Sequence, residues 1–302
     1  MTGNTGNTGN TGNTGNTGNT GNTGNAGISG ETGGGWFVPD RVDLPFVTEV
    51  DPPTGTEIGD LRITGLSLNG FPLRNWSARW NAWLVLHEFA RTNWDAAATT
   101  AVNPIWVLIN AATTDAEIDE LARAARDERA AALGEILSQD VEFISDFMGL
   151  LTITPGSHPN TYRALHIASL IGSYAALYFK GVTPQYRNRP RPSQLCPALR
   201  PPIPVPGHPA FPSGHATQAH LMARSVARVL APPTLPAADA TVLTKDLNVL
   251  AGRVARNREI AGLHYRTDSE AGEALAASVY NTLVATPVAT YAAAINDAKG
   301  EW

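Results

Sequence analysis

The sequence predicts an all-α protein whose core is a single helical bundle. Apolar residues recur at spacings of three and four from Pro72 to the C-terminal region, as they do in amphipathic helices. No convincing run of alternating apolar and polar residues, the signature of a half-buried strand, interrupts this pattern. With 302 residues, of which 43% are hydrophobic, the chain can bury a sizeable core. We therefore expect one helical domain over residues 73–302.

The N-terminal region predicts no packed structure of its own. Residues 2–25 are eight copies of Thr-Gly-Asn, which offer almost nothing to bury and many glycines that are entropically expensive to order. We expect a disordered repeat tail over residues 1–35. Residues 36–72 are rich in Pro, Gly and Asp and contain short apolar runs. They predict an extended arm that packs on the surface of the helical domain.

The first helices are expected from the spacing of their apolar residues. Residues 76–87 predict one helix, and residues 115–133 predict a second whose first turn carries Asp115 and Glu117. A short helix is expected over residues 143–151. The tryptophans and alanines of these stretches are expected to lie in the core.

Four further helices are expected over residues 160–180, 212–231, 241–262 and 268–285. Asn160 is expected to cap the first of them, and Pro212 to stand in the first turn of the second. The most apolar run, residues 164–179, is about 16 residues long. A membrane span needs about 20 residues, so we expect a buried core helix and no membrane span.

Composition restricts the class of protein. The formal net charge of −5 leaves no basic excess for a nucleic-acid backbone, so we expect no nucleic-acid partner. A single cysteine, Cys196, rules out an intramolecular disulfide and a Cys-rich zinc site. The N-terminus has neither the basic nor the apolar region of a secretory signal, which favours a soluble, cytoplasmic protein. The sequence indicates no oligomeric state.

A first cluster of candidate functional residues lies at 186–192, where arginines alternate with prolines and polar residues. Arg187, Arg189 and Arg191 carry planar guanidinium forks that suit two oxygens of a tetrahedral anion. The prolines hold the backbone extended. The alternative interpretation is a solvated basic loop.

A second cluster is Pro212-Ser213-Gly214-His215. At the start of a helix, the free N–H groups and the positive end of the dipole attract an anion. The Ser213 hydroxyl adds a donor, Gly214 permits close approach to the backbone, and His215 can donate a proton. The alternative is an ordinary Pro-Ser helix cap followed by an incidental histidine.

A third cluster joins Arg258, His264 and Asp268. His264 and Asp268 are four residues apart, which places them on one face if they lie on a helix. A carboxylate on one ring nitrogen fixes the tautomer and leaves the other nitrogen free to attack an electrophile. Arg258 is near enough in sequence to hold the same anion. The alternative is a surface ion pair on a helix.

Together, in this order, the clusters resemble the superfamily of type 2 phosphatidic acid phosphatases, bacterial non-specific acid phosphatases and vanadium haloperoxidases. Its pattern is K-x6-R-P, then P-S-G-H, then S-R-x5-H-x3-D. The second block matches fully, and the third matches except that Asn257 replaces serine. The resemblance covers roughly residues 160–285 and implies a helical bundle of the acid phosphatase and vanadium haloperoxidase type.

The resemblance also implies roles for individual residues. His264 would be the nucleophile of a phosphatase or the vanadate ligand of a peroxidase, Asp268 would orient it, and His215 would be the general acid. The oxyanion would be bound by the first-block arginine, by Arg258 and Ser213, and by the Gly214 N–H.

The first block departs from the pattern. In family members with an R-x-R-P run the second arginine is the ligand, which here is Arg191. Counting back seven residues from it gives Pro184 instead of lysine. Lys180 lies four residues earlier and Arg187 three residues later. Either could supply the missing charge, and Arg189 is a further candidate for the anion site.

Three functions are compatible with these motifs. The preferred one is a soluble phosphate-ester hydrolase that forms a phosphohistidine and needs neither metal nor other cofactor. The first alternative is a haloperoxidase that carries vanadate on His264 and oxidises bromide or iodide with hydrogen peroxide. In that reading His208 is a candidate for the halide pocket, because bromide- and iodide-oxidising members place a histidine there. The second alternative is a catalytically inactive helical binding protein. The expected partner is a small phosphate ester or another tetrahedral oxyanion.

Overall fold

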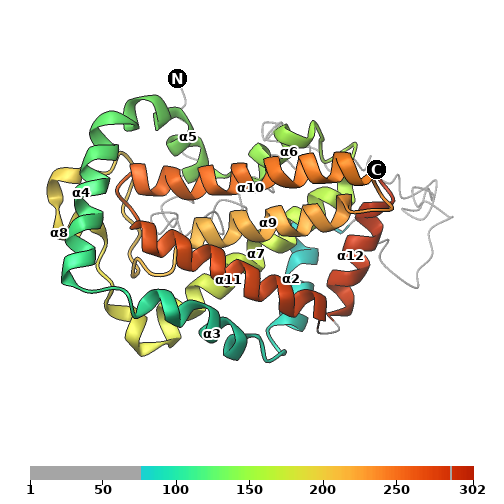
Figure 1. Cartoon of the computed structure of the whole chain (residues 1–302). Helices are drawn as coiled ribbons and strands as arrows, with labels where there is room; N and C mark the ends of the chain where they lie inside the picture. Colours follow the sequence, from blue (N-terminus) through green and yellow to red (C-terminus); the bar gives the residue numbers. More distant parts are fainter. Residues whose placement is uncertain (1–75, 286–287) are drawn as a thin grey trace, which may run out of the picture.

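The computed structural model describes residues 76–285 and 288–302, and every regular element in these ranges is a helix. The all-α prediction is therefore confirmed (Figure 1). The predicted tail over residues 1–35 and the predicted arm over residues 36–72 lie outside the described residues.

The helices follow one another with short connections. They are α2 (Ala78–Phe89), α3 (Trp94–Trp106), α4 (Ala111–Asp127), α5 (Arg129–Val141), α6 (Ile144–Leu151), α7 (Pro159–Val182), α8 (Pro192–Leu195), α9 (Gly214–Leu230), α10 (Ala237–Ile260), α11 (Arg266–Ala285) and α12 (Ala289–Lys299), with short 3₁₀ helices η5 (Pro184–Asn188) and η6 (Pro197–Leu199).

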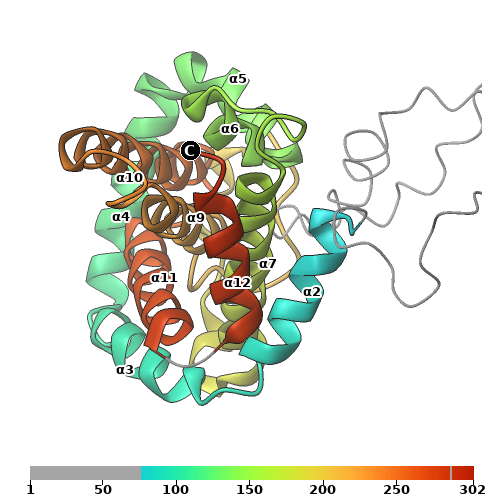
Figure 2. The ribbon, with the colours of Figure 1, turned by 90° about the vertical axis from the view of Figure 1, so that its right-hand side faces the viewer.

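Helix α9 lies at the centre of the bundle. It packs against α7, α10 and α11, and α12 covers its C-terminal part, as the end-on view in Figure 2 shows. Helix α2 packs on α7, α3 packs on α11, and α4 and α5 pack against α10. Thirteen of the 17 residues of α9 are buried, so the hydrophobic effect acts on most of its surface. The loops at one end of α9 are therefore held by a rigid scaffold.

Two glycines bring the neighbouring helices unusually close to α9. A Cβ on Gly272 of α11 would lie 2.7 Å from the Ser213 carbonyl oxygen and 2.8 Å from the Ala216 Cβ. A Cβ on Gly172 of α7 would lie 2.9 Å from the Gln218 Cα. No larger side chain fits at either place without a backbone shift. These contacts set the position of the N-terminal half of α9.

Helix α2 buries a different face from the one predicted. Trp80 and Trp83, expected in the core, have exposed fractions of 58% and 50%, so that prediction is wrong. The stripe that packs inward contains Ala82, Val85 and Phe89. The predicted face was inferred from the spacing of the tryptophans, whereas Ala82, Val85 and Phe89 form the face that is buried.

The stretch predicted as one helix over residues 115–133 forms two helices. Helix α4 begins earlier than expected because Asn110 caps it. The Asn110 side chain accepts the Thr113 N–H at 3.1 Å, and the Thr113 hydroxyl accepts the Asn110 N–H at 2.9 Å. Glu117 consequently lies beyond the first turn and is buried. The helical path breaks at Glu128, between α4 and α5.

The cap predicted for α7 and the first-turn position predicted for Pro212 are also wrong. Asn160 lies within the first turn of α7, where its N–H and that of Thr161 donate to the Glu301 carboxylate at 2.6 and 2.8 Å. The first turn is thus capped by a carboxylate from the far end of the chain. Pro212 stands before the first turn of α9, because the N-cap residue is Ser213.

The helices expected over residues 143–151, 241–262 and 268–285 are confirmed as α6, α10 and α11, with boundaries that differ by a few residues. Helices α3 and α12 form where no helix was predicted. Within the described residues, no helix is both long enough and apolar enough to cross a membrane.

Candidate active site

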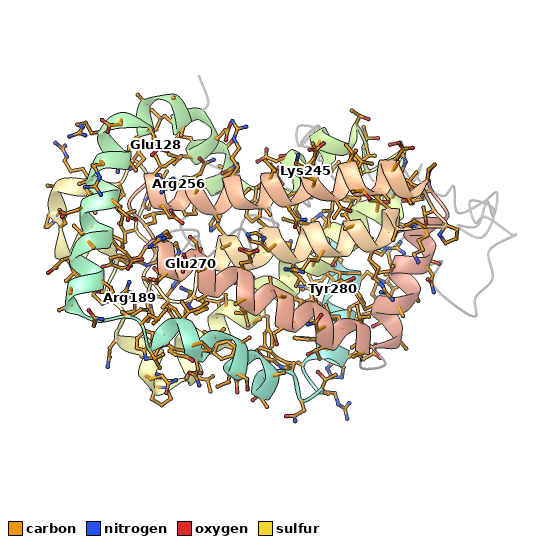
Figure 3. The ribbon with its side chains drawn as sticks, viewed as in Figure 1. Glu128, Arg189, Lys245, Arg256, Glu270 and Tyr280 are labelled. Atoms are coloured by element: carbon orange, nitrogen blue, oxygen red, sulfur yellow. The ribbon has the colours of Figure 1, made fainter. Side chains whose placement is uncertain are left out.

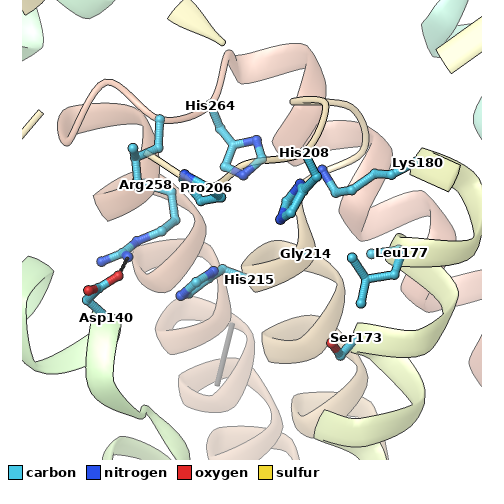
Figure 4. Close-up of a pocket in the computed structure, with 12 residues that line it drawn as sticks. Asp140, Ser173, Leu177, Lys180, Pro206, His208, Gly214, His215, Arg258 and His264 are labelled. Carbon is cyan, nitrogen blue, oxygen red and sulfur yellow. Dashed lines mark ion pairs between the residues drawn. The ribbon is translucent and has the colours of Figure 1, made fainter. Parts of the chain in front are cut away.

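The candidate site lies at the end of the bundle where α9 and α11 begin and α7 and α10 end. Six of the predicted residues line one cavity there, as Figure 4 shows: Lys180, His208, Gly214, His215, Arg258 and His264. Lys180 and Arg258 stand in the last turns of α7 and α10, where a cation is favoured by the helix dipole. Gly214 and His215 stand in the first turn of α9, where an anion is favoured.

The turn that carries His264 is set by the end of α10. Gly262 adopts a left-handed conformation, with a φ of 79°. Its N–H donates to the Glu259 carbonyl at 2.7 Å, and the Leu263 N–H donates to the Arg258 carbonyl at 3.0 Å. These two bonds form a Schellman motif, which ends the helix and reverses the chain. The motif fixes the spacing between Arg258 and His264.

His264 lies in the turn before α11 and not on a helix, so the expectation that it shares a helix face with Asp268 is wrong. The two side chains meet because Asp268 caps the start of α11. Asp268 Oδ2 accepts the Tyr265 N–H at 3.0 Å and lies 3.2 Å from His264 Nδ1. Burial raises the pKa of Asp268 to about 6, and Arg189 acts in the opposite direction. The carboxylate is therefore largely ionised at neutral pH.

The contacts of His264 define its tautomer. Arg191 Nη1 lies 3.0 Å from His264 Nε2, and a guanidinium can only donate. Nε2 consequently carries the lone pair, and Nδ1–H donates to Asp268. Burial, followed by the charges of Arg191 and Lys180, holds the pKa of His264 well below its usual value. The ring is thus neutral, with its nucleophilic nitrogen engaged only by a hydrogen-bond donor.

Arg191 is a buried cation that is not among the residues lining the cavity, and all three of its guanidinium nitrogens make contacts. Its Nε donates to the His208 carbonyl at 3.0 Å, Nη1 donates to the Leu263 carbonyl at 2.9 Å, and Nη2 contacts His208 Nδ1 at 3.0 Å. Burial lowers its pKa to about 10, so it stays charged at neutral pH. Arg191 thereby joins the first predicted cluster to the turn that carries His264.

Arg258 has donors left over. Its Nη2 donates to the Ile136 carbonyl at 2.8 Å, and Nη1 lies 3.6 Å from Asp140 Oδ1. Nε and Nη1 are buried, and neither has a hydrogen-bond partner among the described residues. Buried donors are normally paired in folded proteins. Because Arg258 lines the cavity, these N–H groups are suited to bind the oxygens of an anion.

Lys180, and not Arg187, reaches the site. Lys180 is buried, and its Nζ donates to the Pro209 and Ala210 carbonyls at 2.7 and 2.8 Å. Burial and the charge of Arg191 hold the pKa of Lys180 well below its usual value. Arg187 is exposed and donates to a carbonyl at the end of α7. Lys180 and Arg191 are further apart in sequence than the family pattern requires, and the 3₁₀ helix η5 lies between them.

Two residues of the second cluster have different places: Ser213 caps α9, whereas Gly214 lines the cavity. The Ser213 hydroxyl accepts the Ala216 N–H at 3.4 Å, and the Ser213 N–H donates to the Asp268 carbonyl at 2.9 Å. Ser213 is therefore the N-cap of α9 and ties it to α11, and it is not among the residues that line the cavity. Gly214 does line it, and a Cβ there would meet only the Ala176 Cβ at 4.0 Å.

His215 is held by residues that the sequence motifs do not include. Its Nε2 lies 3.3 Å from the Gln139 carbonyl, so Nε2 carries the proton of the neutral ring. Its ring stacks on Phe143 with centroids 5.1 Å apart. Asn257, which replaces the serine of the family pattern, donates to the Gln139 side chain at 2.9 Å. Burial and the charge of Arg258 hold the pKa of His215 well below its usual value.

His208 completes the lining. Its Nδ1 contacts Arg191, and its buried Nε2 has no hydrogen-bond partner among the described residues. Burial, with Lys180 and Arg191, lowers its pKa to about 3. Arg189 is buried beside Asp268 and does not line the cavity. Gln139 supports the site from α5, and no local pattern in the sequence marks it.

No protein-family model matches the chain, and no curated protein matches its sequence. In the described ranges, no group of three or more His, Cys, Asp or Glu side chains is arranged to hold a metal ion.

Proposed function

We propose that this chain is a phosphate-ester hydrolase that acts through a phosphohistidine on His264. The observation that carries the proposal is the pairing of a neutral imidazole with unpartnered cationic donors in one cavity. His264 presents Nε2 as its unprotonated nitrogen, and Arg258 presents two buried nitrogens, Nε and Nη1, that have no hydrogen-bond partner among the described residues. A phosphoryl group needs such a nucleophile and such a clamp for its equatorial oxygens.

The cavity beside His264 has little room before an anion binds. Its volume is about 10 Å³, which is on the order of one water molecule. A phosphoryl group bonded to Nε2 must therefore replace the hydrogen bond from Arg191 Nη1. That donor can then turn to a phosphoryl oxygen. Arg191 would therefore donate to His264 Nε2 in the free protein and to the phosphoryl group in the complex. The first N–H groups of α9, at Gly214, would complete the clamp.

The reaction would proceed in two displacements. Nε2 of His264 attacks phosphorus, the bond to the leaving alcohol oxygen breaks, and His215 gives that oxygen a proton. Asp268 stabilises the imidazolium that forms. Water then attacks phosphorus and gives a proton to His215 as the P–N bond breaks, which releases inorganic phosphate. An anion in the cavity opposes the charge of Arg258, so we expect His215 to take up its proton when substrate binds.

Hydrolysis of p-nitrophenyl phosphate tests the proposal. We expect His264→Ala to reduce kcat at least about 10³-fold, because it removes the nucleophile. His215→Ala should reduce kcat about 10²-fold or more through loss of the general acid. His87→Ala, which changes an exposed histidine of α2, is the matched control and should keep full activity. Full activity in purified His264→Ala would exclude the mechanism.

One observation favours a second function, that of a vanadium haloperoxidase. His208 lines the cavity with an unpartnered Nε2, and Lys180 reaches the same cavity. The residues fit vanadate as they fit phosphate: His264 Nε2 would bond to it, and Arg191 and Arg258 would donate to its oxygens. Bound vanadate would supply the chemistry that activates hydrogen peroxide toward halide.

The two functions respond to vanadate in opposite ways. A phosphatase should be inhibited, because vanadate imitates its transition state. A peroxidase should gain bromide oxidation when vanadate and hydrogen peroxide are added. Vanadate binding itself can be followed by ⁵¹V NMR without any turnover. Bromide oxidation that requires vanadate, together with no phosphate-ester hydrolysis, would replace the first proposal with the second.

A further inference from the structure

A second buried cluster lies outside the cavity lining, beside the turn that carries His264. It joins α4, the segment around Arg189 and the first turn of α11, three parts of the chain that are far apart in sequence. Glu117 and Arg189 are each only 4% exposed. Figure 3 shows Arg189 between α4 and the beginning of α11. No sequence motif marks Glu117, and the proposed reaction does not use it.

Glu117 holds the start of α11. One carboxylate oxygen accepts the Thr267 N–H at 2.7 Å, and the other accepts the Thr267 hydroxyl at 3.1 Å. A carboxylate at the start of a helix also interacts favourably with the helix dipole. The same oxygen that binds the Thr267 hydroxyl accepts Arg189 Nη2 at 3.0 Å. Glu117 thus fixes both the helix that carries Asp268 and the arginine next to it.

Arg189 is held on several sides. Its Nη1 donates to the Thr114 hydroxyl at 3.0 Å, and its Nη2 also reaches the Thr267 hydroxyl at 3.2 Å. Its guanidinium carbon lies 3.9 Å from the centre of the Tyr265 ring. Tyr265 directly follows His264, so Arg189 packs against the turn that presents the nucleophile. The side chain has little freedom to move.

Arg189 faces the free oxygen of Asp268. Asp268 Oδ2 is occupied by His264 Nδ1 and the Tyr265 N–H, whereas Oδ1 has no hydrogen-bond partner among the described residues. Arg189 Nε, which also lacks such a partner, lies 3.6 Å from Oδ1. An ion pair on one carboxylate oxygen restricts rotation of the carboxylate, which orients the other oxygen toward His264.

We propose that Glu117 and Arg189 are positioning residues that hold Asp268, and through it the His264 ring, in the orientation needed for attack. Glu117 fixes Arg189, Arg189 fixes the Asp268 carboxylate, and the carboxylate holds the His264 ring through the Nδ1–H hydrogen bond. The effect on this hydrogen bond follows from the contacts alone. The effect on turnover rests on the proposed function. Arg189 therefore acts through Asp268 and does not bind the oxyanion.

The test uses the full chain with ¹⁵N-labelled histidine at one neutral pH. His264→Ala assigns the His264 resonances. Arg191 Nη1 keeps Nε2 unprotonated in every variant, so the readout is the exchange of the Nδ1–H proton with solvent. We expect slow exchange in the wild type, where this proton is bonded to Asp268, and faster exchange in Arg189→Met and Glu117→Gln. Hydrolysis of p-nitrophenyl phosphate should show kcat lowered about 10- to 100-fold with a nearly unchanged KM, as for other residues that orient a reacting group through a neighbour. Arg189→Lys should recover part of the loss, because it keeps the charge beside Asp268.

Arg256→Met is the matched control. Arg256 is also paired with acidic residues, at 2.7 Å with Glu128 and 2.9 Å with Glu259, but it has no ion pair with Asp268. Figure 3 shows Arg256 and Glu128 at the junction of α10 with the start of α5. This variant should keep both the wild-type exchange rate of the His264 Nδ1–H proton and the wild-type kcat.

The outcomes separate the positioning role from the proposed function. If folded Arg189→Met and Glu117→Gln keep the slow exchange of the His264 Nδ1–H proton, the positioning role is overturned, even if thermal stability falls. If this exchange becomes faster while the wild type hydrolyses no phosphate ester, the positioning role stands and the phosphatase proposal fails. If Arg189→Met does not fold, Glu117→Gln and Arg189→Lys give the same two answers.

Discussion

The chemistry of the site depends on two imidazoles whose protons are placed differently. His264 donates from Nδ1 to Asp268 and keeps Nε2 unprotonated, whereas His215 directs its Nε2 proton to the Gln139 carbonyl. Burial and nearby cations lower the pKa of both rings, so both are neutral at pH 7 in the free protein. In the proposed reaction, one neutral imidazole would serve as the nucleophile, and the other would gain and lose a proton as an anion enters. Individual hydrogen bonds therefore assign the two roles.

Gly214→Ala tests whether an anion approaches the start of α9. The added Cβ has room, because only the Ala176 Cβ lies nearby, at 4.0 Å, and thermal stability should not fall. The methyl group would, however, stand beside the backbone N–H that is proposed to bind a phosphoryl oxygen. We expect KM for p-nitrophenyl phosphate and the Kd for inorganic phosphate to rise about tenfold, equivalent to about 1.4 kcal/mol. Enzyme kinetics and isothermal titration calorimetry measure the two constants.

Gly252→Ala is the control for this substitution. It makes the same chemical change on the exposed side of α10, where a Cβ would meet nothing within 4 Å. Phosphate affinity should stay as in the wild type, and stability should rise by about 0.5–1 kcal/mol. An unchanged phosphate affinity in Gly214→Ala would show that the anion does not contact this N–H.

At the scale of elements, helix ends build the site, and they were only partly predictable. The start of α9 at Pro212-Ser213-Gly214 and the end of α10 before His264 followed from local residue types. The orientation of His264 did not, because it depends on a Schellman turn and on Asp268 as a cap, and not on one helix face. Local sequence indicates where a helix ends more readily than where the chain points afterwards.

The left-handed turn at Gly262 yields a prediction for that element. A Cβ at Gly262 would have ordinary contacts, the nearest being Leu199 Cβ at 3.4 Å, so the penalty comes from its φ of 79°. We expect Gly262→Ala to lower the free energy of unfolding by about 1–2 kcal/mol. Gly262→Asn should lose about half as much, since asparagine tolerates this conformation better. Urea unfolding with an unchanged m-value would measure both; equal losses would argue against backbone strain.

At the scale of the whole molecule, contacts between residues that are far apart in sequence were the ones that the sequence did not predict. The grouping of Arg191, Gly214, Arg258 and His264 at one end of the bundle could be predicted, because these residues lie in recognisable local blocks. Glu117 could not, because it reaches Thr267, 150 positions away, and no local pattern signals that contact. The tertiary fold also separated three arginines of similar local sequence: Arg191 beside His264, Arg189 beside Asp268, and Arg187 exposed to solvent.

The fold also buries several histidines in neutral form, which makes the stability of the whole molecule depend on pH. Burial lowers the pKa of His166 to about 4 and of His208 to about 3, and holds His215 and His264 well below the usual value. A depressed folded-state pKa favours folding above the unfolded-state value, and this contribution is lost as the pH falls. Asp268, whose pKa is raised to about 6, acts in the opposite sense, as do Asp146 and Glu259, whose pKa values burial also raises. Because the pKa shifts of the four histidines are large, we expect net destabilisation by acid.

His166 allows the dependence of stability on pH to be measured at a residue outside the candidate site. It lies in α7 against the edge of the Tyr162 ring, and its folded-state pKa of about 4 compares with 6.5 when unfolded. Its contribution is complete above pH 6.5 and is lost as the pH falls toward 4. We expect His166→Gln to reduce the drop in unfolding free energy between pH 7.5 and pH 5 by about 2 kcal/mol. Urea unfolding at both pH values measures this, with exposed His87→Gln as the control. An identical drop in His166→Gln and wild type would show that His166 is not buried in neutral form.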